Sequence, residues 1–226
     1  MISRSRPILC YVTSRHRLGP QAGVPALLDC IRRAAGAGVD WIQIREKDLS
    51  GEYLLDLSLA AITGTRLPDG GSKSATQPQE TSVLINDRLD VALAVNAAGV
   101  HLGGQSVPVA ALGKFRGSLF PNDFLIGASC HSQDAARAAE QDGADYVLFG
   151  PIFETPSKAG MGPPQGIARL AAICHAVRIP VLAIGGITTG NACECIAAGA
   201  AGIAAIRLFQ ESANLGRDVA EIRAGL

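Results

Sequence analysis

The sequence predicts a single-domain (β/α)8 barrel, the TIM-barrel architecture, over residues 1–226. Short apolar runs alternate with helical patterns eight times, and such alternation requires parallel strands joined by right-handed crossovers. The chain has 226 residues, of which 48% are hydrophobic, which is enough to bury one large core. An open doubly wound sheet is the alternative, but no Gly-x-Gly-x-x-Gly follows the first expected strand. Eight units therefore favour a closed barrel.

The expected strands are short apolar runs that end at glycine, proline or polar residues. They cover residues 8–13, 40–47, 82–85, 100–102, 124–128, 146–149, 180–184 and 202–206. The expected helices follow each strand and have apolar residues at helical spacing. They cover residues 24–38, 50–65, 88–96, a segment from about 108, a segment capped by Ser132, then 167–177, 188–198 and the C-terminal segment.

Residues 66–80 form a low-complexity segment without an apolar period. We expect a solvated loop there, between a helix and the next strand and away from the carboxyl ends of the strands. No function is predicted for it.

The equal numbers of basic and acidic residues exclude a strong net electrostatic field around the protein. Lys plus Arg total 20 and Asp plus Glu total 20, so we expect neither nucleic acid nor a membrane surface as a partner, and any anion site must be local. The six cysteines are scattered without a CxxC pair, which is typical of reduced, packed thiols in a cytoplasmic protein. The sequence leaves open whether the chain forms a homo-oligomer.

Polar residues stand at the carboxyl end of most expected strands. In residues 40–47, alternation places Trp41, Gln43, Arg45 and Lys47 on one face of the strand. In a barrel, strand ends from distant parts of the chain converge on one mouth. We therefore expect one site there, formed by Gln43, Arg45, Lys47, Asn86, Asp87, Ser129, His131, Thr155, Ser157, Lys158, Gly185, Gly186 and Arg207.

The loop after the sixth strand presents two hydroxyls and an ammonium, from Thr155, Ser157 and Lys158. Such groups suit an oxygen-rich anion, although an ordinary exposed turn is the alternative. Gly185 and Gly186 follow the seventh strand, where barrels commonly bind phosphate through backbone N–H groups. The alternative for this pair is a tight turn into a helix.

Arg45, Lys47 and Lys158 form a second cationic group, which is sufficient to hold a diphosphate. Asp87 is the natural carboxylate for a bridging Mg²⁺. The alternatives are salt bridges of the cations to Glu46 or Asp48, and a helix N-cap role for Asp87. His131 is either a general acid or base or a hydrogen-bonded structural residue.

At these residues the chain resembles the thiamine phosphate synthase and thiazole tautomerase superfamily along nearly its whole length. The resemblance is carried by residues 43–47, 84–93, 99–103, 127–131, 144–158 and 183–187, and by Asn191 with Ala192. These segments are specific together, whereas none of them is specific alone.

The resemblance implies coupling of hydroxymethylpyrimidine diphosphate to a thiazole phosphate, with release of diphosphate. By position it places Gln43, Arg45, Lys47, Asn86, Ser129 and Lys158 at the pyrimidine diphosphate, and Asp87 at Mg²⁺. It places Thr155, Ser157, Gly186, Ile206 and Arg207 around the thiazole phosphate. The expected catalytic residues are His131, Lys158 and Arg45.

One departure from the synthases concerns the metal. Where they typically carry a glutamine and a second Mg²⁺-binding aspartate, this chain has Gly104 and Ser106. Loss of a carboxylate weakens a Mg²⁺ site, although water and diphosphate can complete the coordination sphere.

Two other functions stay open. The tautomerase branch has no use for that metal and moves a proton with the histidine that matches His131; against it, Lys47, Asn86 and Asp87 are present. The other alternative is a non-catalytic barrel that binds a phosphate ligand.

Overall fold

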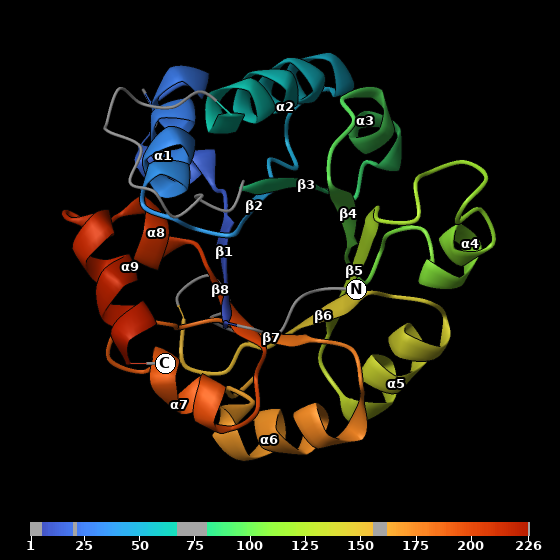
Figure 1. Ribbon diagram of the computed structural model, residues 1–226, viewed down its shortest axis with the longest axis vertical. Coiled ribbons are helices and arrows are strands. Elements are labelled where there is room, and N and C mark those ends of the chain that lie inside the picture. Colours follow the sequence, from blue (N-terminus) through green and yellow to red (C-terminus); the bar gives the residue numbers. More distant parts are fainter. Residues whose placement is uncertain (1–5, 20–21, 67–80, 156–161, 226) are drawn as a thin grey trace.

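The computed structural model describes residues 6–19, 22–66, 81–155 and 162–225. Its strands form a closed parallel barrel in the order of the sequence, surrounded by helices (Figure 1). The strands are β1 (Ile8–Val12), β2 (Trp41–Ile44), β3 (Ser82–Asn86), β4 (Gly99–Leu102), β5 (Leu125–Cys130), β6 (Tyr146–Phe149), β7 (Val181–Ile184) and β8 (Gly202–Ala205). The helices are η1 (Arg15–Leu18), α1 (Val24–Gly36), α2 (Gly51–Arg66), α3 (Leu89–Ala94), α4 (Val109–Gly113), α5 (Gln133–Gln141), α6 (Gly166–Ala176), α7 (Ala192–Ala197), α8 (Arg207–Gln210) and α9 (Leu215–Ala224). The predicted (β/α)8 barrel is therefore confirmed.

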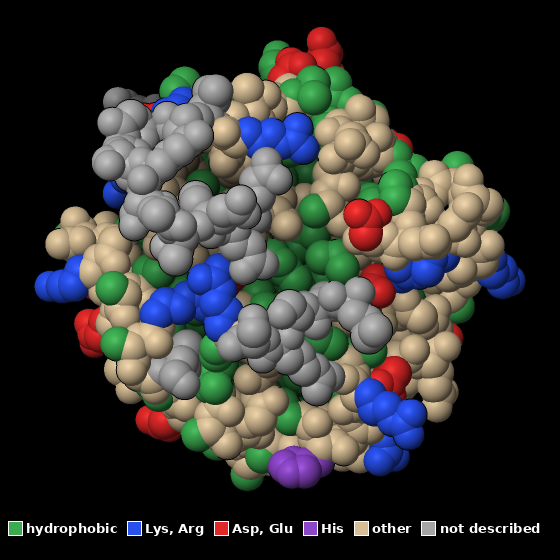
Figure 2. All heavy atoms as spheres, viewed as in Figure 1, with side chains coloured by type: hydrophobic (Ala, Val, Ile, Leu, Met, Phe, Trp, Pro, Cys, Tyr) green, Lys and Arg blue, Asp and Glu red, His purple; other side chains and the backbone are tan. Residues whose placement is uncertain are grey.

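Alternation along each strand divides the core into two layers. Inside the barrel, Trp41, Tyr146 and Leu148 pack with other inward-facing residues. Outside it, Ile42 and Ile44 pack with the surrounding helices. Figure 2 shows hydrophobic side chains in the middle of the molecule, inside the ring of helices. The predicted division of residues 41–44 between two faces is correct, because the side-chain period of a strand is two.

Several segments differ from the sequence prediction. Strand β2 ends at Ile44, so Arg45 and Lys47 follow the strand instead of lying within it, as the predicted strand 40–47 had them, and helix η1 was not predicted. Strand β5 continues to Cys130, so Ser129 lies within the sheet. Helix α7 starts at Ala192 instead of residue 188, because the Asn191 side chain accepts from the Thr188 N–H at 2.8 Å and donates to the Gly186 carbonyl at 3.0 Å. These bonds form a turn before the helix. A short helix, α8, was not predicted and separates β8 from α9.

Other expectations concern local features. Ser132 caps α5, as predicted, by accepting from the Ala135 N–H at 3.1 Å. All six cysteines are free thiols. Arg66 belongs to α2 and not to a loop, and the rest of the low-complexity segment, residues 67–80, lies outside the described residues. Within the described residues, no helix is both long and apolar enough to cross a bilayer.

Candidate active site

A cavity of about 340 Å³ opens at the carboxyl ends of the strands. Most of the predicted site residues line it: Gln43, Arg45, Lys47, Asn86, Ser129, His131, Thr155, Gly185, Gly186, Ile206 and Arg207. Ser157 and Lys158 lie outside the described residues. Asp87 is not among the lining residues, but it is hydrogen-bonded to Asn86, which is. The barrel thus brings together side chains that are far apart in the sequence.

Asp87 is held by donors from three directions. The Ser106 hydroxyl donates to Oδ1, the Gly103 N–H donates to the same oxygen at 3.3 Å, and Asn86 donates to Oδ2 at 2.9 Å. The Lys47 ammonium lies 3.9 Å from Oδ2. Partial burial opposes the charge of Asp87, but these hydrogen bonds and Lys47 outweigh it and lower the pKa of the carboxyl. Asp87 is therefore an anion at neutral pH.

The backbone of Asp87 is also unusual. Its φ is +63°, a left-handed conformation that non-glycine residues rarely adopt. No side-chain cap is present at α3, and the Asp87 carboxylate instead binds the donors described above. The N-cap alternative for Asp87 is thus not what the structure shows.

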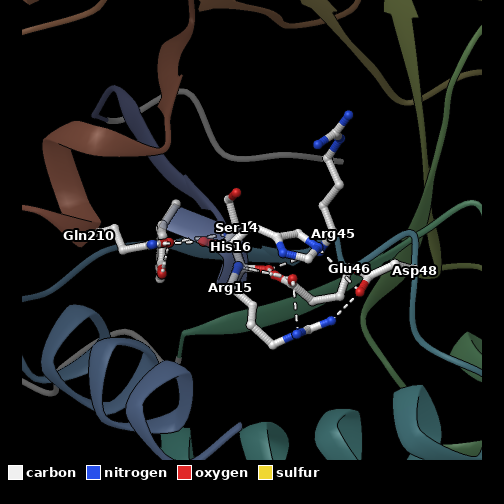
Figure 3. Close-up of polar contacts among 9 residues, drawn as sticks. Ser14, Arg15, His16, Arg45, Glu46, Asp48 and Gln210 are labelled. Carbon is white, nitrogen blue, oxygen red and sulfur yellow. Dashed lines mark hydrogen bonds and ion pairs between the residues drawn. The ribbon is translucent and has the colours of Figure 1, made fainter. Parts of the chain in front are cut away.

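A hydrogen-bond network surrounds Glu46, the residue that follows Arg45 after β2 (Figure 3). The buried Glu46 carboxylate accepts from the Thr13 hydroxyl at 2.7 Å and from the Arg15 N–H at 2.9 Å. Arg15 and His16 also pair with Asp48. The Arg45 side chain extends away from Glu46 and lines the cavity. Among the described residues, Arg15 forms the ion pair with Glu46, with Nε 3.9 Å from Oε2, and Arg45 and Lys47 do not.

Gln210 fixes the loop after β1 from the other side. Its side chain accepts from the Tyr11 hydroxyl at 2.8 Å and from the Ser14 N–H at 3.1 Å, and it donates to the Ser14 carbonyl at 2.8 Å. Gln210 is the last residue of α8, so these bonds tie α8 to the loop that holds Glu46.

Gly185 and Gly186 form a turn that only glycine fits. Their φ angles are +99° and +69°. A Cβ on Gly186 would lie 2.6 Å from the Glu154 carbonyl oxygen, and one on Gly185 would lie 2.6 Å from the Pro151 Cβ. The pair is thus both a tight turn, as the alternative reading had it, and part of the cavity wall.

His131 lines the cavity and is exposed. Its Nδ1 is 2.6 Å from the Gly150 carbonyl oxygen and must carry the hydrogen, because a carbonyl only accepts. In the neutral ring, Nε2 then has no hydrogen and can accept a proton, which the resulting imidazolium can deliver again. This geometry is compatible with acid or base chemistry and equally gives His131 a structural bond.

Several cavity-side residues were missed from the sequence. His101 is buried between Ser129 and Tyr146, and burial lowers its pKa to about 3, so it is neutral. Arg17 also lines the cavity. The alternation of β4 gives the signal that could have revealed His101: it is a polar residue on the inward face of a strand. The loop after β1 has no such period.

The fold and the site define a (β/α)8 barrel whose cavity, at the carboxyl ends of the strands, is lined by basic side chains and by a glycine turn. Residues 9–209 match the family described as thiamine monophosphate synthase, and the chain belongs to this family.

Named relatives agree with this assignment. The thiamine-phosphate synthase of Methanoculleus marisnigri is 44% identical over 178 residues, covering 79% of this chain and 77% of that one. The thiamine-phosphate synthase of Moorella thermoacetica is 38% identical over 213 residues, covering 94% and 93%. Among solved structures, a thiamine phosphate pyrophosphorylase from Pyrococcus furiosus superposes with a TM-score of 0.78 at 30% identity, covering 98% of this chain and 96% of that one.

Proposed function

We propose that the chain is a thiamine-phosphate synthase, which couples hydroxymethylpyrimidine diphosphate to thiazole phosphate and releases diphosphate. The observation that carries this proposal is that two sets of anion-binding groups share one cavity. Arg45 and Lys47 line it, and so do Gly186 and Arg207 from the other half of the barrel. Two anionic substrates can therefore meet in one place.

The first set suits the pyrimidine diphosphate. Arg45 and Lys47 supply positive charge for the diphosphate, and Lys158 is proposed to add to it. Gln43 donates to Asn86 at 2.9 Å, and its own Oε1 is buried with no partner among the described residues. A buried acceptor without a donor is costly, so a ligand that carries an N–H group satisfies it.

The second set suits the thiazole phosphate. The turn at Gly185 and Gly186 brings backbone close to the cavity, and Arg207 begins helix α8 after Ile206, the one residue that separates it from the last strand. Barrels commonly hold phosphate between the loops that follow these two strands. Thr155 and Ser157 are proposed to add hydroxyl donors.

The reaction breaks the carbon–oxygen bond between the pyrimidine methylene and the diphosphate. The electron pair leaves with the diphosphate, and the fixed cations stabilise the negative charge that develops on it. The thiazole nitrogen then forms the new carbon–nitrogen bond to the pyrimidine cation, and its phosphate anchor has already placed it within reach. These residues thus act through charge and position.

Mg²⁺ is proposed as a cofactor, and the residues fit it only through one carboxylate. Among the described residues, no three His, Cys, Asp or Glu side chains cluster as a metal site. Both lone pairs of Asp87 Oδ1 receive donors, whereas Oδ2 has Asn86 at 2.9 Å and Lys47 only at 3.9 Å. Asp87 Oδ2 would hold the ion together with diphosphate oxygens and water. Bound there, Mg²⁺ would neutralise charge on the leaving diphosphate.

Thiazole tautomerase is the second candidate, and His131 favours it. With Nδ1 bound to the Gly150 carbonyl, Nε2 can exchange a proton with a ligand. Lys47 and Asp87 lie side by side and are proposed to bind diphosphate and Mg²⁺. A tautomerase needs neither group, so the synthase is preferred.

One assay separates the candidates. The purified chain is incubated with both synthase substrates and Mg²⁺, and separately with the thiazole tautomer alone. Product formed only from the mixture supports the synthase, and isomerisation without metal supports the tautomerase. Tight binding of a phosphate ligand without turnover supports the non-catalytic barrel. A cytoplasmic location stays a prediction, and whether the chain forms a homo-oligomer stays open.

A further inference from the structure

Three polar side chains form a row of hydrogen bonds from the barrel interior to the cavity. The Tyr146 hydroxyl lies 3.1 Å from His101 Nδ1, and His101 Nε2 lies 2.8 Å from the Ser129 hydroxyl oxygen. Tyr146 is completely buried and His101 is 1% exposed, whereas Ser129 is partly exposed and lines the cavity. These hydrogen bonds therefore connect the buried Tyr146 hydroxyl to the cavity.

A glycine makes this contact possible. His101, Gly127 and Tyr146 are register partners on the adjacent strands β4, β5 and β6. A Cβ on Gly127 would lie 2.4 Å from the Tyr146 hydroxyl oxygen. Because Gly127 has no side chain, His101 and Tyr146 meet across the strand between them. The contact is thus built into the barrel's inner face.

The direction of the hydrogen bonds follows from burial. Among the described residues, the Tyr146 hydroxyl has no hydrogen-bond partner other than His101 Nδ1. A buried hydroxyl that does not donate loses a hydrogen bond that water would supply, so Tyr146 donates to Nδ1. Nδ1 then carries no hydrogen, and Nε2 is the protonated nitrogen. Nε2–H donates to Ser129, whose own hydrogen must point elsewhere.

We infer that His101 and Tyr146 are positioning residues that fix the Ser129 hydroxyl as a hydrogen-bond donor to the cavity. The ligand atom that meets the Ser129 hydrogen must therefore be an acceptor. That this acceptor is a diphosphate oxygen rests on the proposed function. The direction of the hydrogen bonds from Tyr146 through His101 to Ser129 does not rest on it.

The opposite direction makes a different prediction. If Ser129 donated to Nε2, Nδ1–H would donate to Tyr146, and the tyrosine's hydrogen would be left without an acceptor among the described residues. Ser129 would then offer only lone pairs to the ligand. The two arrangements differ in the nitrogen that carries the proton, which can be observed directly.

The first test is ¹⁵N nuclear magnetic resonance of the histidine rings at neutral pH. The chain has four histidines, and a variant with His16→Gln, His131→Gln and His175→Gln leaves only His101. We expect a proton on Nε2 and none on Nδ1. A proton on Nδ1 would overturn the inference. Tyr11→Phe removes another buried hydroxyl, which donates to Gln210 at 2.8 Å, and should leave the His101 signals unchanged.

The second test measures binding of inorganic diphosphate by calorimetry. Ser129→Ala should weaken it by about tenfold or more, and Tyr146→Phe by roughly threefold, since each removes part of one hydrogen-bond chain. The double variant should bind like Ser129→Ala alone, because the groups act as a unit. Independent, additive losses would overturn the inference. If the unmodified protein binds no diphosphate, the proposed function is wrong. The position of the proton on His101 still decides the direction of the hydrogen bonds from Tyr146 through His101 to Ser129.

Discussion

The hydroxyl of Thr13 donates a 2.7 Å hydrogen bond to the buried Glu46 carboxylate and accepts one of 2.9 Å from the N–H of Arg45. One side chain from the loop after β1 thus binds both residues that follow β2. Glu46 lies between the two cations in the sequence, so its anchoring inside the protein directs Arg45 and Lys47 to the cavity.

Replacing Thr13 by the isosteric valine should loosen this junction. The Arg45 N–H and one Glu46 oxygen each lose a partner, which should lower the free energy of unfolding by about 1–3 kcal/mol. The KM for the diphosphate substrate should rise more than kcat falls, because Arg45 loses its position. Urea titration and steady-state kinetics measure the two effects. Thr13→Ser keeps the hydroxyl and should behave like the unmodified chain; a valine variant with unchanged KM contradicts the positioning role.

Gly186→Ala should damage the proposed thiazole phosphate site. The new Cβ would meet the Glu154 carbonyl oxygen at 2.6 Å, and the φ of +69° disfavours any side chain. The KM for thiazole phosphate should rise at least tenfold, while binding of inorganic diphosphate changes little. Gly190→Ala is the matched control, because its Cβ would meet nothing closer than the Thr188 hydroxyl oxygen at 3.9 Å. Equal effects of both substitutions would refute a specific role for Gly186.

The spacing of apolar residues predicted the barrel, because strands and helices each repeat their buried positions at a fixed interval along the sequence. Trp41 and Gln43 could be placed on the inward face from alternation alone. The polar residues at the strand ends predicted the position of the site, because the carboxyl ends of parallel strands meet at one end of a barrel. The positions of Gly186 and Arg207 at one cavity follow from topology and needed no side-chain detail.

Features that depend on partners distant in the sequence were not predictable. Glu46 has the sequence context of an exposed acid, and only its bonds to Thr13 and Arg15 explain its burial. Helix α8 has four residues, which is too short to show an apolar period. The delayed start of α7 depends on which backbone groups the Asn191 side chain binds.

Stability should rise with pH between about pH 4 and 6, in part because of His101. Burial lowers the pKa of His101 to about 3, while the unfolded chain has the ordinary value of 6.5. Between these values the unfolded state binds a proton that the folded state does not, so acid favours unfolding. The slope from one such group is at most about 1.4 kcal/mol per pH unit. Urea titrations at several pH values measure it. A His101→Gln variant should show a flatter profile, and an equally steep one would mean that other groups cause the slope.

Ser106→Asp should strengthen Mg²⁺ binding. Ser106 now donates to Asp87, and a second carboxylate at that place would add negative charge and ligand oxygens. We expect at least tenfold tighter Mg²⁺ binding by calorimetry in the presence of diphosphate, and a lower Tm without metal because the two carboxylates repel each other. Asp87→Asn should instead abolish Mg²⁺ binding and coupling. Asp90→Asn, at an exposed carboxylate paired with Arg88, is the control. Retention of coupling by Asp87→Asn would remove Asp87 as the metal ligand.

His131→Ala should distinguish the two candidate reactions. If His131 moves a proton, its loss abolishes isomerisation of the thiazole tautomer, whereas coupling depends on charge and position and should only slow, by about tenfold or less. His175→Ala is a matched control, because His175 Nδ1 also binds a backbone carbonyl, that of Ala171 at 2.7 Å, but does so on an exposed helix surface. It should leave both reactions unchanged. Equal loss of coupling and isomerisation in His131→Ala, with an unchanged Tm, would mean that the imidazole supports substrate binding in general, since a group needed only for proton transfer affects only the reaction that moves a proton.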